Sequence, residues 1–341
     1  MIELKQDRLV FSFPELHPQA QLNIEMQRTL RIPDDGKTYP LPPGLGEFPI
    51  RHVDDYASEV PDSWRKRGGV MMPMYQSEAL WLNFDSRYIA NRGVYPFAIK
   101  IATGKINAVT GEDWSEPLGN RPQDYVVSPK QPWLDGYCVS KGKIRQFVAM
   151  PLGAGYSAEE QITGEAEFGG IQIKVIPMKR AEFEKRFPEN DRAGRFMMDA
   201  AFSETISCMV EPEMGLAPGG EMRQEIYDDE FGIDVWDESL SSRCFVHLTN
   251  SLVWRSITGQ NPPHAPVTAK KYSQYGLPWF DYYSDRTAIQ GSSILDKLKS
   301  VVQIGKEKGQ KPLPENQSAD IQNVKVLSGK KFPDQVREGN F

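Results

Sequence analysis

Apolar and polar residues alternate with a period of two over several short stretches of this chain. Such alternation is typical of β-strands that bury one face. We predict strands at 9–13, 22–26, 79–84, 143–150, 170–176 and 243–248, and a hairpin formed by 97–102 and 106–109 around a Thr-Gly-Lys turn. In the strand at 170–176 one face carries Ile and Val. The other face carries Gln172 and Lys174, where we expect water or a polar partner.

Helix signals are fewer and cover short stretches. Ser157 and Glu160 have the spacing of a capping box, and Gly164 follows as a helix stop. The longest predicted helix covers 293–304, where apolar residues form one stripe and Gly305 ends it. Other short helices are predicted at 61–68, 180–187, 250–257 and 268–275.

These signals predict a mixed α+β fold with a β-rich, mainly antiparallel sheet core, short peripheral helices and an extended C-terminal tail. Residues 1–190 are expected to form the β-rich core, and residues 191–304 a mixed α/β portion packed on it. The boundary falls in a stretch whose second part, 211–220, has the Pro and Gly content of a loop. Residues 305–341 are rich in Lys, Gln and Pro, so we expect an extended tail, which a groove on a neighbouring subunit could hold.

Bulk composition narrows the class of protein. The chain has 341 residues, 39% of them hydrophobic and 25% charged, which is ordinary for a globular protein. Its formal net charge of −6 lacks the basic excess of nucleic-acid binders, so we expect no nucleic-acid partner. The three widely spaced cysteines predict no disulfide framework and favour a cytoplasmic location. No apolar run reaches the roughly 18–20 residues that span a bilayer, so we expect no membrane insertion.

Two Pro-Trp-apolar-Asp tetrads, 132–135 and 278–281, are the most unusual local chemistry in the chain. In each, Pro restricts the backbone and Asp can accept hydrogen bonds from the amides that follow, as in a turn. The structural interpretation is a pair of anchors that fix a bulky indole. The functional alternative is an aromatic pocket for a planar or sugar-like ligand. We expect Trp133 to lie in the core and Trp279 to lie at a contact surface.

The segment 271–283 is the densest aromatic stretch of the chain. Aromatic residues are enriched at protein interfaces, so this segment is the candidate contact surface. The candidate binding residues, for a protein or a ligand, are Tyr272, Tyr275, Trp279, Phe280, Tyr282 and Tyr283, together with Trp133 and Asp135.

The strongest acidic cluster covers 225–238. Carboxylates at this density could hold Ca²⁺ or Mg²⁺. Counted from Asp228, however, the fifth position is Gly232, whereas an EF-hand loop has its glycine at the sixth, so a solvated acidic loop is the alternative. The candidate metal ligands are Asp228, Asp229, Asp234 and Asp237. Phosphate-loop and dinucleotide fingerprints are absent, and we predict no cofactor.

Two functions remain open. The first is a non-catalytic cytoplasmic protein that binds copies of itself, as a homo-oligomer, or another protein. It is favoured by the lack of catalytic motifs, the aromatic stretch and the tail. The second is an enzyme, hydrolase-like or metal-assisted, whose site is assembled from residues distant in sequence. Its candidate residues are Asp135, Arg145, Asp228, Asp234 and His247.

Overall fold

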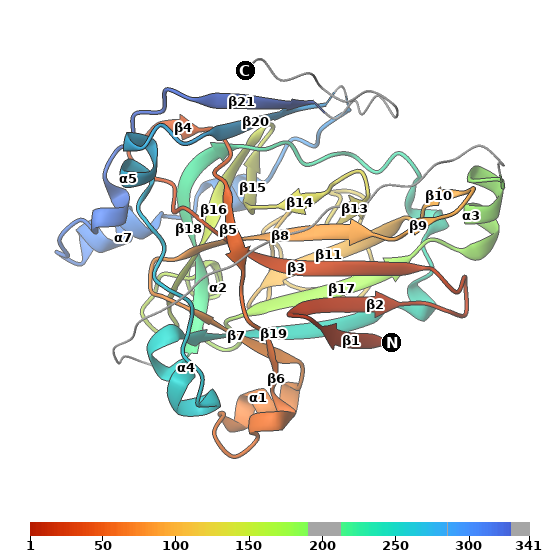
Figure 1. Cartoon of the computed structure of the whole chain (residues 1–341), viewed down its shortest axis with the longest axis horizontal. Coiled ribbons are helices and arrows are strands. Elements are labelled where there is room, and N and C mark those ends of the chain that lie inside the picture. Colours follow the sequence, from red (N-terminus) through yellow and green to blue (C-terminus); the bar gives the residue numbers. More distant parts are fainter. Residues whose placement is uncertain (190–212, 285, 329–341) are drawn as a thin grey trace.

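The computed structural model describes residues 1–189, 213–284 and 286–328. Within these ranges the predicted fold class is confirmed, since a large, mainly antiparallel sheet carries short helices at its periphery (Figure 1). The α-helices are α1 (Asp62–Arg67), α2 (Ala158–Thr163), α3 (Arg180–Arg186), α4 (Ser251–Thr258), α5 (Ala269–Gln274), α6 (Ser293–Asp296) and α7 (Val301–Glu307). Single 3-10 turns are η1 (Asp54–Tyr56), η2 (Ile233–Val235), η3 (Glu238–Leu240) and η4 (Pro314–Asn316).

One sheet contains 17 of the strands found in the described residues. They are β1 (Ile2–Lys5), β2 (Arg8–Ser12), β3 (Gln21–Thr29), β4 (Thr38–Tyr39), β5 (Gly44–Glu47), β6 (Arg51–His52), β7 (Val70–Met74), β8 (Ala79–Ser86), β11 (Phe97–Thr103), β12 (Ile106–Asn107), β13 (Val126–Ser128), β14 (Trp133–Leu134), β15 (Gly136–Ser140), β16 (Lys143–Pro151), β17 (Ile171–Pro177), β18 (Glu213–Arg223) and β19 (Ser242–Asn250). Two smaller sheets pair β9 (Tyr88–Ile89) with β10 (Gly93–Val94), and β20 (Trp279–Tyr283) with β21 (Val324–Ser328).

The longer strands follow one antiparallel path through the sheet. Hydrogen bonds connect them in the order β1-β2-β3-β8-β16-β18-β19-β17-β11-β13. In Figure 1, β2, β3, β8, β11, β17 and β19 run roughly horizontally, whereas β15, β16 and β18 cross steeply near their left ends. Parallel pairing is limited within the described residues to β4 with β18, β7 with β19 and β20 with β21.

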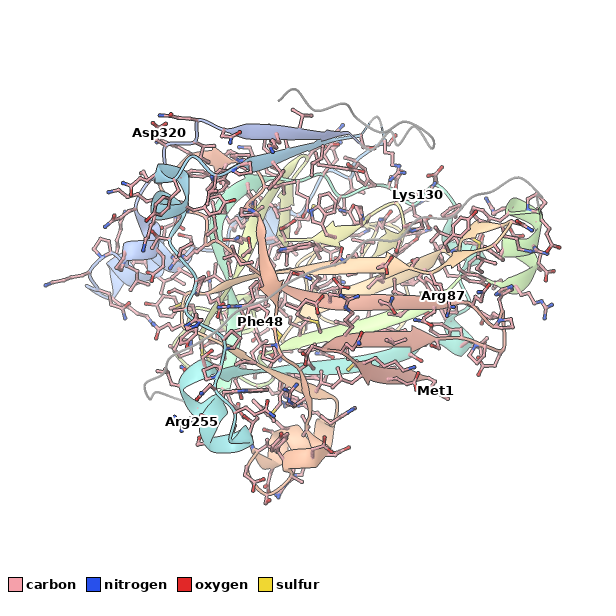
Figure 2. The ribbon with its side chains drawn as sticks, in the orientation of Figure 1. Met1, Phe48, Arg87, Lys130, Arg255 and Asp320 are labelled. Atoms are coloured by element: carbon pink, nitrogen blue, oxygen red, sulfur yellow. The ribbon has the colours of Figure 1, made fainter. Side chains whose placement is uncertain are left out.

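The sheet encloses one main apolar core. Inward side chains of β3, such as Leu22 and Ile24, and of β11, such as Ile99, belong to the same buried cluster. The rings of Phe13 and Phe97, which come from the two ends of the strand path, lie 5.7 Å apart. Figure 2 shows side chains filling the space between the strands. The path therefore closes over a shared core, and strands from both sides of residue 190 contribute to it.

Short-range sequence signals located most of the helices. The capping box of Ser157 and Glu160 is present at the start of α2, and Gly164 adopts the left-handed conformation that ends this helix. Asn250 caps α4 and Gly259 ends it. The predictions at 61–68, 180–187 and 268–275 are confirmed by α1, α3 and α5.

The single helix predicted at 293–304 is wrong. Two helices occupy this stretch, because Ser292 caps α6 and Ser300 starts α7 with a capping box of its own. The Oγ atom of Ser300 accepts a hydrogen bond from the amide of Gln303, and the Gln303 side chain bonds back to the Ser300 amide. A competing cap inside an apolar stripe divides the helix. Gly305 lies within α7 instead of ending it.

The loop predicted at 211–220 is also wrong over its described part. Residues from Glu213 onward form β18, which pairs with β16 over most of its length. The glycines serve close packing instead of a turn. A Cβ on Gly220 would lie 2.4 Å from the carbonyl oxygen of Pro33, and one on Gly219 would lie 2.6 Å from Val148. Residues 190–212, where the rest of the proposed boundary falls, lie outside the described residues.

The described part of the tail lies on its own chain. Asn316 accepts a hydrogen bond from the amide of Asp34 at 2.7 Å, and the hydroxyl of Tyr156 donates to Gln310 at 2.7 Å. The tail then continues into β21, which pairs with β20. Residues 329–341 lie outside the described residues.

Candidate functional site

The first Pro-Trp tetrad contacts the residue that follows the second. Trp133 of β14 and Tyr282 of β20 make an edge-to-face contact, with ring centroids 4.9 Å apart. Trp81 of β8 lies against Trp133 with its centroid at 6.5 Å. Aromatic rings in such T-shaped pairs attract one another beyond the effect of burial alone. One aromatic cluster therefore joins the first tetrad to the predicted contact segment.

The placement of the two tryptophans is the reverse of the prediction. Trp279 is completely buried, and its indole nitrogen donates to the hydroxyl of Ser273 at 3.0 Å. Its strand is covered on both edges, by β21 and by Leu41, which exchanges two hydrogen bonds with Phe280. Trp133 is only partly buried, because β14 has two residues and, among the described strands, pairs with β8 alone. Trp279 is a core anchor and Trp133 reaches the surface.

Asp135 lies in the interior behind Trp133. Its side chain accepts a hydrogen bond from the Gln224 amide at 2.7 Å, and its backbone amide donates to the same Gln224. Burial raises the pKa of the Asp135 carboxyl to about 7, although the hydrogen bonds from Gln224 and Trp133 act in the opposite direction. The folded protein therefore holds this proton to a higher pH than an exposed aspartate does.

A small crevice opens beside this carboxyl. It is lined by Leu41, Gln131, Pro132, Trp133, Arg223, Gln224, Glu225, Tyr227 and Tyr282. It has room for about one water molecule, and Asp135 is not among its lining residues. A sugar-sized ligand does not fit this space, so the ligand-pocket alternative gains no support from the geometry.

Buried glutamines hold the segment after β18 against the strand segment that carries Trp133. The Gln131 amide donates to the carbonyls of Trp133 and Glu225, and its oxygen accepts from the amide of Tyr227. Gln224 makes the same kind of two-way contact with Asp135. A glutamine side chain has the same donor and acceptor as a peptide group. Each of the two glutamines can therefore take the place of a backbone hydrogen bond between neighbouring segments. Hydrogen bonds among neighbouring residues thus hold the glutamines that line the crevice.

Exposed apolar side chains lie on β21, the strand that pairs with β20 of the predicted contact segment, and on the residues just before β20. Figure 1 places β21 at the top of the molecule, with β20 between it and the main sheet. Three apolar side chains of β21 are exposed: Val324 by 40%, Val326 by 66% and Leu327 by 44%. Tyr275 and Leu277 precede β20 and are exposed by 71% and 43%. We call these five side chains the β21 surface.

The hydrogen bond from the Asn323 side chain to the Gly276 carbonyl, 2.9 Å long, joins the two parts of this surface. The sequence analysis named Tyr275 but missed Val324, Val326, Leu327 and Leu277. Alternating apolar residues in Val-Lys-Val-Leu were the signal for β21, and the surrounding tail composition concealed it.

The other predicted contact residues have structural partners. Asp281 forms a two-bonded ion pair with Arg223, with both distances at 2.9 Å. Tyr272 is buried and donates to the Pro278 carbonyl at 3.2 Å. Phe280 and Tyr282 are partly buried against the main core. The backbone of Tyr283 belongs to β20, but its side chain lies outside the described residues.

The acidic candidates do not form a metal site in the described structure. Asp229 accepts hydrogen bonds from the hydroxyl of Tyr125 at 2.6 Å and the indole of Trp236 at 2.9 Å. Asp228 and Asp234 are exposed, and Asp237 accepts from the hydroxyl of Ser239 next to it. Among the residues that the structure describes, no group of three or more His, Cys, Asp and Glu is placed to hold a metal ion.

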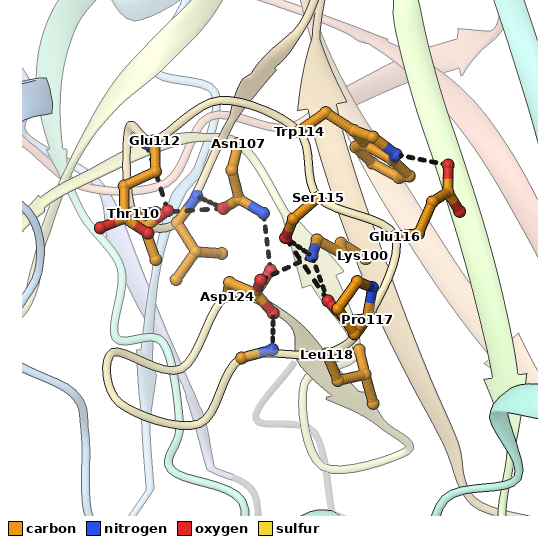
Figure 3. A network of polar contacts seen from close by, with 12 residues as sticks. Lys100, Asn107, Thr110, Glu112, Trp114, Ser115, Glu116, Pro117, Leu118 and Asp124 are labelled. Carbon is orange, nitrogen blue, oxygen red and sulfur yellow. Dashed lines mark hydrogen bonds and ion pairs between the residues drawn. The ribbon is translucent and has the colours of Figure 1, made fainter.

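A polar network, shown in Figure 3, stabilises the loop between β12 and β13. The Lys100 ammonium is buried and forms an ion pair with Asp124 at 2.6 Å. It also donates to the Ser115 hydroxyl at 2.9 Å and to the Pro117 carbonyl at 2.8 Å. These three contacts use all three of its donors. The lysine therefore has a structural role.

Lys174, on the polar face of β17, is likewise buried and donates to Glu116, which confirms the expected polar partner. Gln172 on the same face donates to the Gly104 carbonyl at 2.5 Å.

The residues of the enzyme hypothesis share no hydrogen-bond partner among the described residues. Arg145 donates to the Leu298 carbonyl. His247 is buried, stacks on Trp64 with centroids 4.5 Å apart, and lies 3.0 Å from the Gly68 carbonyl through Nε2. Burial lowers the pKa of the His247 imidazole to about 4, so it is neutral at physiological pH. Asp135, Asp228 and Asp234 have the separate surroundings described above.

No helix in the described ranges is long and apolar enough to cross a membrane.

Comparisons with known proteins do not indicate a function for these residues. The chain matches no protein-family model, and neither the curated proteins nor the solved structures contain a match to it.

Proposed function

We propose that this chain is a non-catalytic cytoplasmic protein that acts by binding a protein partner through the β21 surface. The observation that carries the proposal is the exposure of three apolar side chains, those of Val324, Val326 and Leu327, on an edge strand. Within the described residues, β20 is the one strand hydrogen-bonded to β21. Edge strands of soluble proteins usually carry charges, prolines or bulges that prevent pairing with another chain.

The chemistry of the surface supports strand addition as the mode of binding. An exposed edge offers backbone hydrogen bonds, and alternate side chains offer specificity. Tyr275 and Leu277 are also exposed, and the bond from Asn323 to Gly276 brings the backbone between them close to the start of β21. Large exposed apolar patches mark interaction sites. Lys325 is the one charged side chain in β21, so the edge has little electrostatic protection.

The cytoplasmic part of the proposal rests on the cysteines. Cys138 and Cys244 are free and buried, and burial raises the pKa of both thiols to about 12. Such thiols are unreactive and behave as small apolar side chains. The net charge of −6 supports a partner other than nucleic acid.

The test places a photo-reactive benzoylphenylalanine at position 326 of the full chain. A matched control places it at Tyr88, which is 39% exposed on β9, in a different sheet. After irradiation in a cytoplasmic extract, we expect protein adducts from position 326 that position 88 does not give. Equal adducts from both positions, or none from position 326, would contradict the proposal.

A further inference from the structure

We propose that the partner at the β21 surface is a second copy of this chain, bound by antiparallel pairing of the two β21 strands about a two-fold axis at Val326. This inference rests on the proposed function, because it uses the same surface. A two-fold interface brings the same patch of each subunit together, so the patch must be complementary to itself.

The backbone of β21 determines which residues can pair outward. The amide of Trp279 donates to the carbonyl of Asn323 at 2.9 Å, so Asn323 points toward β20. The register of β20 with β21 continues this pattern, with Trp279 opposite Val324 and Asp281 opposite Val326. Peptide groups alternate in direction along a strand. Lys325 and Leu327 therefore also direct their backbone groups toward β20, and Val324, Val326 and Ser328 direct theirs outward.

The register centred on Val326 pairs the largest number of these free groups. Centred on Val326, the two copies pair Val326 with Val326, and Val324 with Ser328 in both directions. Each such pair in an antiparallel ladder exchanges two hydrogen bonds, so the interface gains roughly six. A register centred on Lys325 would pair Val324 with Val326 in both directions, which gains only roughly four hydrogen bonds within β21 and places the two Lys325 side chains directly opposite each other.

The same register also places the side chains favourably with respect to charge and packing. Lys325 of one copy lies opposite Leu327 of the other, so no two lysines face each other directly. Like charges placed directly opposite would destabilise the pair. Val326 packs against its own copy at the centre, which covers the most exposed apolar side chain of the strand, exposed by 66%.

Pairing also completes a sheet that is small in the single chain. β20 and β21 form a two-stranded sheet, supported on its inner side by the bridge between Leu41 and Phe280. A two-stranded ribbon is marginal, and sheets usually gain independent stability with three strands or more. Joining two copies gives a four-stranded sheet in the order β20-β21-β21-β20.

The first experiment compares Val326→Pro with Val326→Thr in the full chain, by light scattering on the purified proteins. We expect the wild type and Val326→Thr to have twice the single-chain mass of 38.6 kDa. Val326→Pro should have the single-chain mass, because proline removes an outward N–H that the single chain does not use. Proline is tolerated where an edge-strand N–H faces solvent, so the fold should persist. A monomeric wild type, or a dimeric Val326→Pro, would overturn the inference.

A second pair of variants keeps the inference testable if Val326→Pro does not fold. In the proposed register the two residues at position 326 have Cα atoms about 5.5 Å apart, within the range that a disulfide bridges. Diagonal neighbours such as the two residues at position 325 are about 7–8 Å apart, beyond that range. Oxidation should link Val326→Cys chains into covalent dimers and leave Lys325→Cys and wild type unlinked. Equal linking of both variants, or none, refutes this register.

The outcomes separate this inference from the proposed function. Photo-adducts from position 326 that contain a different protein, together with a monomeric purified chain, would overturn self-pairing and leave the proposed function standing. The absence of adducts specific to position 326 would instead remove the surface itself as a binding site.

Discussion

Replacing Asp135 with asparagine should stabilise this protein, and the gain should grow as pH rises. The carboxyl has a pKa of about 7 in the folded protein against an ordinary value of 3.8. The folded state therefore retains a proton that the unfolded chain releases. Stability linked to this group is fully present below about pH 4 and is lost as pH rises to about 7. The full difference corresponds to about 4 kcal/mol.

The structure also indicates that asparagine fits the site. Gln224 donates to one carboxyl oxygen at 2.7 Å, and the asparagine side chain retains an oxygen of the same position and size. The substitution removes the ionisable group and leaves the volume nearly unchanged. Any change in pH dependence can therefore be assigned to the proton.

Denaturant unfolding at pH 5 and pH 8 measures the effect. Between these values Asp135 should reduce the unfolding free energy of the wild type by roughly 3 kcal/mol, a loss that Asp135→Asn avoids. Asp113→Asn, at an exposed carboxylate, is the matched control and should follow the wild type. If the wild type and Asp135→Asn lose stability equally between pH 5 and pH 8, the buried carboxyl does not hold its proton and the reasoning is refuted.

Two further variants test buried aromatic sites. His247→Phe should keep the stack on Trp64 and make the protein less sensitive to acid. A histidine pKa lowered to about 4 removes roughly 2–3 kcal/mol as pH falls from 7.5 to 4.5, and unchanged acid sensitivity in denaturant midpoints would contradict this. Trp279→Ala should cost about 3–5 kcal/mol of stability and Trp133→Ala less. If both variants lose the same thermal stability, the difference in burial between the two tryptophans does not determine the cost of removing them.

Local patterns in the sequence predicted those elements whose determinants are close together. The Ser157 and Glu160 capping box, the Gly164 stop and the hairpin around Gly104 each depend on a few neighbouring residues. The helix prediction at 293–304 was wrong because the same local residues are compatible with two structures. Ser300 can continue a helix or cap a new one, and the bond from the Lys299 amide to Gln161, far away in sequence, favours the cap.

Glycines account for the largest error in the predicted fold, the loop at 211–220. The glycines of 215–220 have the composition of a loop, yet they lie in a central strand. Their role depends on segments brought close by the fold, since Gly220 lies against Pro33 and Gly219 against Val148. Glycine permits close backbone approach as well as turns, and a single sequence does not distinguish the two.

Only part of the candidate site could be predicted from the sequence. Its residues come from three distant segments, and local patterns do not show which distant segments meet. Trp133 and Tyr282 were both identified, but nothing local indicated their contact. The burial of Trp279 depends on Leu41 and β21, which lie on either side of its strand. An aromatic stretch predicts a large contact area and leaves open whether the contact is with the same chain.

The burial of Trp279 and the exposure of β21 are two consequences of one arrangement. Trp279 fixes β20 to the body of the protein through Ser273, Leu41 and the surrounding core. β20 in turn holds β21 in parallel register, with its second edge directed away from the main sheet. In the binding mode that we propose, the aromatic segment therefore supports the contact strand. The residues proposed to meet a partner are aliphatic side chains of the tail, because Trp279 is buried beneath the strand that carries them.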